Sequence, residues 1–161
     1  MGLSMGASVI LKDEAATQHF AMQIAAVVRP GDTILLSGPL GAGKSVFARA
    51  FLRALCENPA LDVPSPTYTL VQTYDAPLCA VSHFDLWRLG GPDELEELGW
   101  EEARDGIVLV EWPERLEDLT PDDALHLGVS VLAGGDRQVS IKGWSQRLDA
   151  AGLSLGPETN V

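Results

Sequence analysis

Residues 38–45 read Gly-Pro-Leu-Gly-Ala-Gly-Lys-Ser and match the pattern G-x-x-x-x-G-K-[ST] at every specified position. An apolar run, Thr33–Ser37, precedes this octapeptide, and an amphipathic stretch over Lys44–Leu55 follows it. This order predicts a buried strand that turns through glycines into a helix. The glycines let backbone amides point at one anion, and the positive end of the helix faces the same anion. We therefore predict a phosphate-binding loop in which Lys44 reaches the β- and γ-phosphates and the Ser45 hydroxyl ligates Mg²⁺.

Two further apolar runs end in a carboxylate. Residues 80–85 end at Asp85, and residues 107–111 end at Glu111. Strands of an open α/β sheet bring their carboxyl ends beside the phosphate loop, and a cation there would offset the free-energy cost of burying these charges. We predict that one acid holds Mg²⁺ and the other orients the attacking water. The residues alone leave open which acid has which role.

Two polar residues near these strands are weaker candidates. In Ser65-Pro66-Thr67 the proline keeps Ser65 extended. Thr67 either senses the γ-phosphate or Mg²⁺, as switch loops do, or is a plain loop residue. His83 precedes Asp85 by two residues and lies on the same face of the strand. It either orients that carboxylate or simply packs.

The remaining pattern predicts the fold class. Helical stretches interleave with buried strands over the first two-thirds of the chain, which favours parallel central strands between helical layers. Apolar runs at 125–132 and 138–142 flank Gly134-Gly135-Asp136 and predict a β-hairpin. We therefore expect a three-layer α/β P-loop NTPase fold with a mixed, largely parallel central sheet and a C-terminal β-hairpin. Residues 1–153 would form one domain, and residues 154–161 a disordered tail.

Composition excludes several classes of protein. The 161 residues carry a formal net charge of −12, which disfavours a generic nucleic-acid-binding face. No apolar run is long enough to span a membrane, and the N-terminus does not resemble a signal peptide. Cys56 and Cys79 predict reduced thiols in a cytoplasmic protein. Thirteen acids lie between Asp93 and Asp123 and form either a solvated face or a docking surface for a basic partner.

Five motifs in order resemble one known family, the TsaE proteins, which are bacterial ATPases of tRNA threonylcarbamoyladenosine biosynthesis. These motifs are the phosphate loop, Ser65–Val71, His83–Leu89, Glu94–Gly99 and Leu109–Pro113. The resemblance covers roughly Thr17 to Pro113. It implies a small ATPase that uses ATP and Mg²⁺ and resets a TsaB–TsaD complex, in which TsaD transfers the threonylcarbamoyl group. It also implies that tRNA is reached only through that complex and that no membrane is involved.

The resemblance also assigns site residues. It implies that ATP is bound by Thr17, Gly38, Gly41, Ala42, Gly43, Lys44, Ser45, Val46 and Arg137. It places Ser45 and Glu111 on Mg²⁺, Asp85 as the catalytic or water-positioning acid with the metal as a second possible contact, and Thr67 in a switch. Ser45 stands where threonine is commoner, Trp87 replaces the usual tyrosine, and Pro39 replaces the usual acid of the loop.

Three other functions compete with this interpretation. A P-loop small-molecule kinase would need an arginine-bearing lid, but the arginines after the loop helix do not cluster in the sequence. A GTPase would need the guanine-recognition motif Asn-Lys-x-Asp, which neither Asn58 nor Asn160 begins. A nucleotide-dependent assembly module with incidental turnover overlaps with the family interpretation, and assays with and without partners separate the two.

Overall fold

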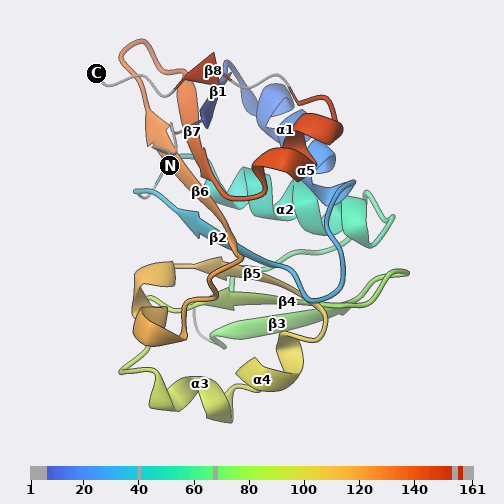
Figure 1. Ribbon diagram of the computed structural model, residues 1–161, viewed down its shortest axis with the longest axis vertical. Helices are drawn as coiled ribbons and strands as arrows, with labels where there is room; N and C mark the ends of the chain where they lie inside the picture. The colour runs from blue at the N-terminus through green and yellow to red at the C-terminus, as the bar shows by residue number, and fades with distance from the viewer. Residues whose placement is uncertain (1–6, 40, 67–68, 154–155, 158–161) are drawn as a thin grey trace.

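The computed structural model describes residues 7–39, 41–66, 69–153 and 156–157. Within them, eight strands form a single sheet (Figure 1). The strands are β1 (Ala7–Leu11), β2 (Thr33–Ser37), β3 (Val71–Asp75), β4 (Ala80–Asp85), β5 (Ile107–Glu111), β6 (Leu125–Val131), β7 (Arg137–Lys142) and β8 (Gly156–Pro157). The helices are α1 (Glu14–Ala25), α2 (Lys44–Leu55), α3 (Asp93–Glu97), α4 (Trp100–Ala103), the 3₁₀ helix η1 (Pro113–Leu119) and α5 (Ser145–Ala150).

The sheet has a parallel centre and antiparallel edges, in the order β3-β4-β5-β2-β6-β7-β1-β8. The neighbours β4, β5, β2 and β6 run parallel, while β3, β7, β1 and β8 join by antiparallel pairing. The predicted mixed sheet and the predicted hairpin of β6 and β7 are thus confirmed. Because β1 pairs antiparallel to β7, it points the same way as β6, so its end at Leu11 lies at the carboxyl edge of the central strands.

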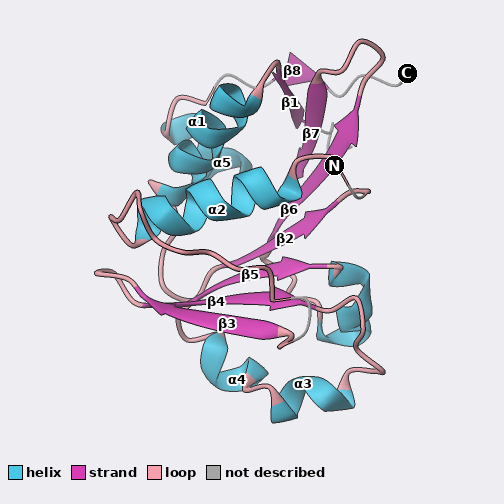
Figure 2. Ribbon diagram, turned by 180° about the vertical axis from the view of Figure 1, so that it is seen from behind, coloured by secondary structure: helices cyan, strands magenta, loops and turns pink. Residues whose placement is uncertain are grey.

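Helices cover both faces of the sheet, which makes the predicted three layers (Figure 2). One apolar core packs α1, α2 and α5 on the sheet and includes Phe20, Phe51 and Leu148. A second core packs α3, α4 and η1 on the opposite face and includes Leu95, Trp100 and Leu116. Successive side chains of a strand point to opposite faces of the sheet, so the central strands contribute apolar residues to both cores. The buried centre fixes the positions of the strand ends, and therefore of the polar residues that follow them.

The chain enters α1 through a side-chain cap. Asp13 has an extended backbone, and its Oδ1 accepts a hydrogen bond from the Ala16 amide at 2.8 Å, as an N-cap residue does. The cap fixes the turn between β1 and α1 at the carboxyl edge of the sheet.

Part of the segment expected to be a tail belongs to the sheet. Gly156 pairs with Ser8 and Pro157 pairs with Ala7, so β8 extends the sheet beyond β1. Among the described helices, the longest has 12 residues, and none is long and apolar enough to cross a bilayer.

Candidate functional site

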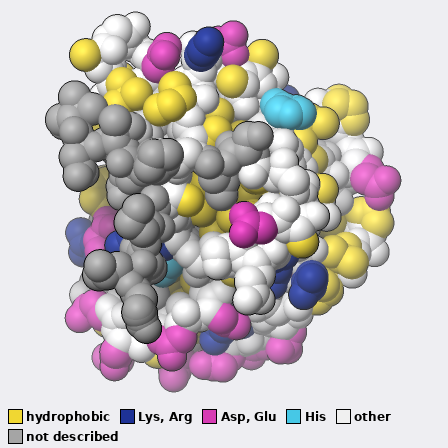
Figure 3. All heavy atoms as spheres, turned by 45° about the horizontal axis from the view of Figure 1, so that its top comes forward, with side chains coloured by type: hydrophobic (Ala, Val, Ile, Leu, Met, Phe, Trp, Pro, Cys, Tyr) yellow, Lys and Arg dark blue, Asp and Glu magenta, His cyan; other side chains and the backbone are white. Residues whose placement is uncertain are grey.

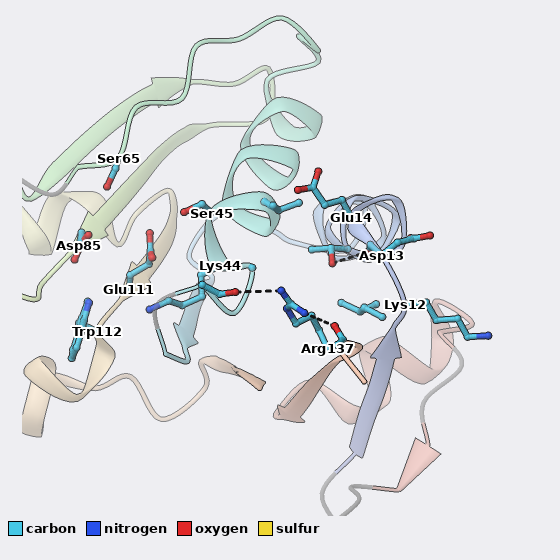
Figure 4. Close-up of a pocket in the computed structure, with 16 residues that line it drawn as sticks. Lys12, Asp13, Glu14, Lys44, Ser45, Ser65, Asp85, Glu111, Trp112 and Arg137 are labelled. Carbon is cyan, nitrogen blue, oxygen red and sulfur yellow. Dashed lines mark hydrogen bonds between the residues drawn. The ribbon is translucent and has the colours of Figure 1, made fainter. Parts of the chain in front are cut away.

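A cavity of about 440 Å³ opens at the carboxyl edge of the sheet, where the polar strand ends meet (Figure 4). Five parts of the chain line it: the phosphate loop with the start of α2, the ends of β4 and β5, the turn from β1 into α1, the β6–β7 hairpin, and the loop before β3 at Ser65. Side chains from segments far apart in the sequence therefore face one space. Ligands of open α/β sheets bind at this edge.

The phosphate loop presents an uncapped helix end to the cavity. Gly41 and Gly43 have φ values of +81° and +105°, in the left-handed region that glycine favours. Gly43 is the N-cap of α2 and provides no side-chain cap, so the amides of the first turn lack intrahelical partners. This end of α2 can accept an anion.

Two predicted loop residues serve the loop's own structure. At Gly38, which has φ +143°, an added Cβ would lie 2.5 Å from the Val129 carbonyl oxygen, so a glycine is needed where the loop passes β6. The Ala42 side chain is buried in the core, and its amide donates to the Pro39 carbonyl at 3.2 Å. Of the other predicted residues, Thr17, Gly41, Gly43 and Val46 line the cavity. Thr67 lies outside the described residues, whereas Ser65 of the same loop lines the cavity.

Lys44 and Ser45 both face the cavity from the first turn of α2. Lys44 is only 8 % exposed, and its Nζ lies 5.5 Å from the centroid of the Trp112 ring. Trp112 directly follows β5 with φ +57° and also lines the cavity. The aromatic face stabilises the ammonium group of this largely buried lysine.

Asp85 and Glu111 lie side by side at the ends of their strands. They are paired in the register of β4 and β5, and both line the cavity. Asp85 is 7 % exposed, and burial raises the pKa of its carboxyl above the usual range, with the Glu111 charge adding to the rise. The Trp87 amide, which donates to Asp85 Oδ1 at 3.3 Å, lowers the same pKa, as do the nearby His83 and Lys44.

His83 contacts Glu111 and not Asp85, the carboxylate that its spacing suggested as a partner. Its Nε2 lies 2.7 Å from Glu111 Oε2 across the β4–β5 pair. Same-strand spacing suggested Asp85, but side chains two residues apart on a strand are about 7 Å apart, so the neighbouring strand offers the closer carboxylate.

Arg137 binds the phosphate loop itself. Its Nε donates to the Ala42 carbonyl at 3.0 Å and its Nη2 to the Gly41 carbonyl at 3.3 Å, while Nη1 donates to the Gly135 carbonyl in its own hairpin. Arg137, which we predicted to contact the nucleotide, thus lines the cavity, but its N–H groups donate to backbone carbonyls. The guanidinium ties β7 to the loop before α2.

Sequence reasoning missed the wall of the cavity formed by the turn into α1. Lys12, Asp13 and Glu14 line the cavity there. These residues carry no motif, and long-range contacts, the pairing of β1 with β7 and the packing of α1 on α2, bring them to the site. Trp112 had a usable signal, because it follows the strand-end acid Glu111 directly.

The oxygen atoms at the cavity suit a divalent cation such as Mg²⁺ that binds together with a phosphate group. The Ser45 hydroxyl and the carboxylates of Asp85 and Glu111 offer oxygen atoms, which Mg²⁺ prefers. No group of three or more His, Cys, Asp or Glu residues among the described ones could hold a metal by itself. Mg²⁺ in nucleotide sites is bound by one or two carboxylates together with phosphates, so this set fits a metal shared with a bound phosphate.

Comparison with known proteins shows the family. The profile of the family described as "Threonylcarbamoyl adenosine biosynthesis protein TsaE" matches residues 11–139. A relative from Rickettsia bellii, named tRNA threonylcarbamoyladenosine biosynthesis protein TsaE, is 37% identical over 139 residues, with 85% of this chain and 95% of the relative covered. Relatives of the same name from Bacillus subtilis and Aquifex aeolicus are 30% and 38% identical, covering 90% and 83% of this chain and 90% and 93% of their own.

A solved structure supports the fold alone. The crystal structure of Bacillus subtilis YdiB superposes with a TM-score of 0.72 at 23% identity, covering 94% of this chain and 95% of that one. On the profile match and the curated relatives, this chain belongs to the TsaE family of tRNA threonylcarbamoyladenosine biosynthesis proteins.

Proposed function

We propose that this chain is a Mg²⁺-dependent ATP hydrolase that supports or resets a TsaB–TsaD complex in the cytoplasm during tRNA modification. The observation that carries the proposal is the shared cavity: an uncapped helix end with Lys44 and Ser45 faces two strand-end carboxylates across it. Anion-binding amides and metal-binding oxygens on opposite walls are what a Mg²⁺–triphosphate requires.

Each group then has a defined task. The amides at the start of α2 and the Lys44 ammonium bind the β- and γ-phosphates. Ser45 and Glu111 hold Mg²⁺, which when bound neutralises charge that develops on the phosphate oxygens. Asp85 orients water for attack on the γ-phosphorus. A water oxygen bonds to that phosphorus, the bond to the β–γ bridging oxygen breaks, and Asp85 accepts the water proton.

The state of Asp85 supports this division of roles. Its buried carboxyl has a raised pKa, which makes it a stronger base than a solvated aspartate. Glu111 instead has one oxygen held by His83 at 2.7 Å, an arrangement common for metal-binding carboxylates. The two neighbouring acids therefore differ in environment, and such differences separate acid, base and ligand roles.

The kinase alternative finds little support at the cavity. Arg137 is the one arginine among the described residues that line it, and its guanidinium binds loop carbonyls. A kinase would need free arginines to clamp the transferred phosphoryl group. Assays that detect both free phosphate and a phosphorylated small molecule separate the two activities.

The test compares hydrolysis by matched charge-neutralising variants. We expect wild-type turnover to require Mg²⁺ and to rise when the TsaB–TsaD complex is added. Glu111→Gln should lose about 10²–10³-fold of the rate, as electrostatic groups in active sites do when removed. Glu114→Gln is the control, because Glu114 is exposed on η1. Wild-type turnover in Glu111→Gln, or no ATP hydrolysis by the wild type with its partners, would refute the proposal.

A further inference from the structure

His83 is a buried polar residue that the proposed chemistry does not use directly. It lies in the middle of β4 and is 2 % exposed. Its register partner on β5 is Leu109. Two residues further along both strands, Asp85 pairs with Glu111. The imidazole therefore lies under the two carboxylates rather than in the cavity, and it reaches Glu111 Oε2 at 2.7 Å.

The environment of the ring selects one tautomer. Nδ1 is buried without a hydrogen-bond partner among the described residues. An N–H group at that position would be buried and unsatisfied, which is more costly than an unpaired acceptor. The proton therefore belongs on Nε2, where it is donated to Glu111 Oε2.

This hydrogen bond divides the Glu111 carboxylate into two unlike oxygens. Oε2 accepts from His83, whereas Oε1 accepts no hydrogen bond from the described residues. In Figure 4, Glu111 lies between Asp85 and the loop residues Lys44 and Ser45. One oxygen is thus fixed against the sheet, and the other remains available to a ligand in the cavity.

We propose that His83 is a positioning residue that holds the Glu111 carboxylate for Mg²⁺; this rests on the proposed function. A hydrogen bond to one oxygen fixes the carboxylate rotamer and leaves the other oxygen available to the cation. Partners of this kind orient metal-binding groups, and their loss lowers metal affinity by about ten- to hundred-fold.

The test uses two amides that place a donor at different ring positions. The Nε2 of glutamine is as many bonds from Cβ as the imidazole Nε2, whereas the Nδ2 of asparagine matches the imidazole Nδ1. His83→Gln should therefore keep the bond to Glu111, and His83→Asn should lose it. A purely structural role for the buried histidine would not separate the variants by the position of the donor.

The measurement is Mn²⁺ binding, followed by electron paramagnetic resonance, to the full chain with a non-hydrolysable ATP analogue. We expect His83→Asn to bind Mn²⁺ about ten- to hundred-fold more weakly than the wild type, and His83→Gln to stay within about three-fold, roughly 0.65 kcal/mol at most. Affinity for the analogue without metal should be unchanged. Urea unfolding of each variant shows that it is folded.

Several outcomes would overturn the proposal, and they are distinct from failure of the proposed function. Wild-type Mn²⁺ affinity in His83→Asn, or equal losses in both variants, contradicts the positioning role. An NMR spectrum of the imidazole nitrogens showing the proton on Nδ1 contradicts it as well. If Glu111→Gln binds Mn²⁺ as tightly as the wild type, the metal role of Glu111 fails first, and the proposed function fails with it.

Discussion

The buried position of Asp85 at the site disfavours the charged form of its carboxyl group. The residue is almost fully buried, and the neighbouring Glu111 charge opposes its ionisation. Burying a carboxylate costs free energy, which the nearby Lys44 charge offsets only in part, since the net change in the pKa is upward. Such destabilised groups are common where activity limits stability. The nucleotide-free protein therefore carries a local destabilisation at the residue that we assign to water.

Asp85→Asn should stabilise the nucleotide-free protein at neutral pH. Asparagine can still accept the Trp87 amide bond at Oδ1 but carries no charge. We expect a gain of about 0.5–2 kcal/mol in the free energy of unfolding, the usual range for single stabilising substitutions. Urea unfolding at pH 7.5 measures it, and the same variant should lose ATP hydrolysis.

The pH dependence of that gain checks its cause. Because the folded-state pKa of Asp85 lies above the ordinary value of 3.8, the folded state binds more protons than the unfolded state in the interval between the two values. Wild-type stability from this group therefore falls as pH rises through the interval and stays lower above it. The advantage of Asp85→Asn should shrink as pH is lowered toward 3.8. A gain that grows with acid would contradict burial as its cause.

At this scale, the sequence predicted the residues whose signal is local. Lys44 and Ser45 belong to a contiguous motif, and Asp85 and Glu111 end apolar runs, so strand geometry alone brings them to one edge. The partner of His83 was not predictable in the same way. It depends on the alignment of β4 with β5, which brings together His83 and Glu111, 28 residues apart in the sequence. Spacing within one strand contains no information about that alignment.

Among the elements, the β6–β7 hairpin supports the phosphate loop from the side. Arg137 on β7 donates to two loop carbonyls, and Val129 on β6 lies against Gly38. These contacts hold two carbonyls of the loop on the side of the hairpin. The hairpin therefore contributes to the shape of the loop rather than to direct contact with phosphate.

Arg137→Gln should weaken the loop whether or not nucleotide is present. We expect the free energy of unfolding of the nucleotide-free protein to fall by about 1–3 kcal/mol, because bonds from a charged donor are lost. Affinity for ATP and for ADP should fall by the same factor, since both use the same loop. Calorimetric titrations with each nucleotide test this, with Arg49→Gln on the exposed face of α2 as the control. Unchanged stability with a loss confined to ATP would instead indicate direct contact with the γ-phosphate.

Element prediction succeeded where the pattern was long, as in α2, but missed the short helices α4 and α5. The bounds of α2 were predicted correctly at both ends, because its apolar face and its glycine start are both clear. By contrast, α4 has 4 residues and α5 has 6, too few for a helical repeat to be recognised. The pairing of β1 with β7 is a long-range contact, which local sequence patterns do not specify.

At the scale of the whole molecule, one rim is strongly acidic. Figure 3 shows Asp and Glu side chains gathered along the lower rim, on the side of α3 and α4. The acids of α3, namely Asp93, Glu94, Glu96 and Glu97, are exposed there. A surface of this kind repels phosphate backbones and orients basic partners.

The isolated protein should therefore bind tRNA poorly. With a net charge of −12, it has few cations to displace the counterions of tRNA, so we expect a Kd above about 1 µM at physiological salt, within the range of non-specific binding. Filter binding or fluorescence anisotropy measures this, and addition of the TsaB–TsaD complex provides the comparison. A sub-micromolar Kd for the chain alone would contradict the assignment of tRNA recognition to the partners.

The place of β1 in the sheet has a consequence for biosynthesis. This first strand pairs only with β7 and β8 among the described strands, and these are the last two strands in the chain. On a ribosome, β1 emerges well before β7, with which it pairs along its whole length, whereas α1 can pack on α2 sooner. The wall of the cavity that contains Lys12 and Glu14 therefore lacks the support of β7 until that later strand has been made.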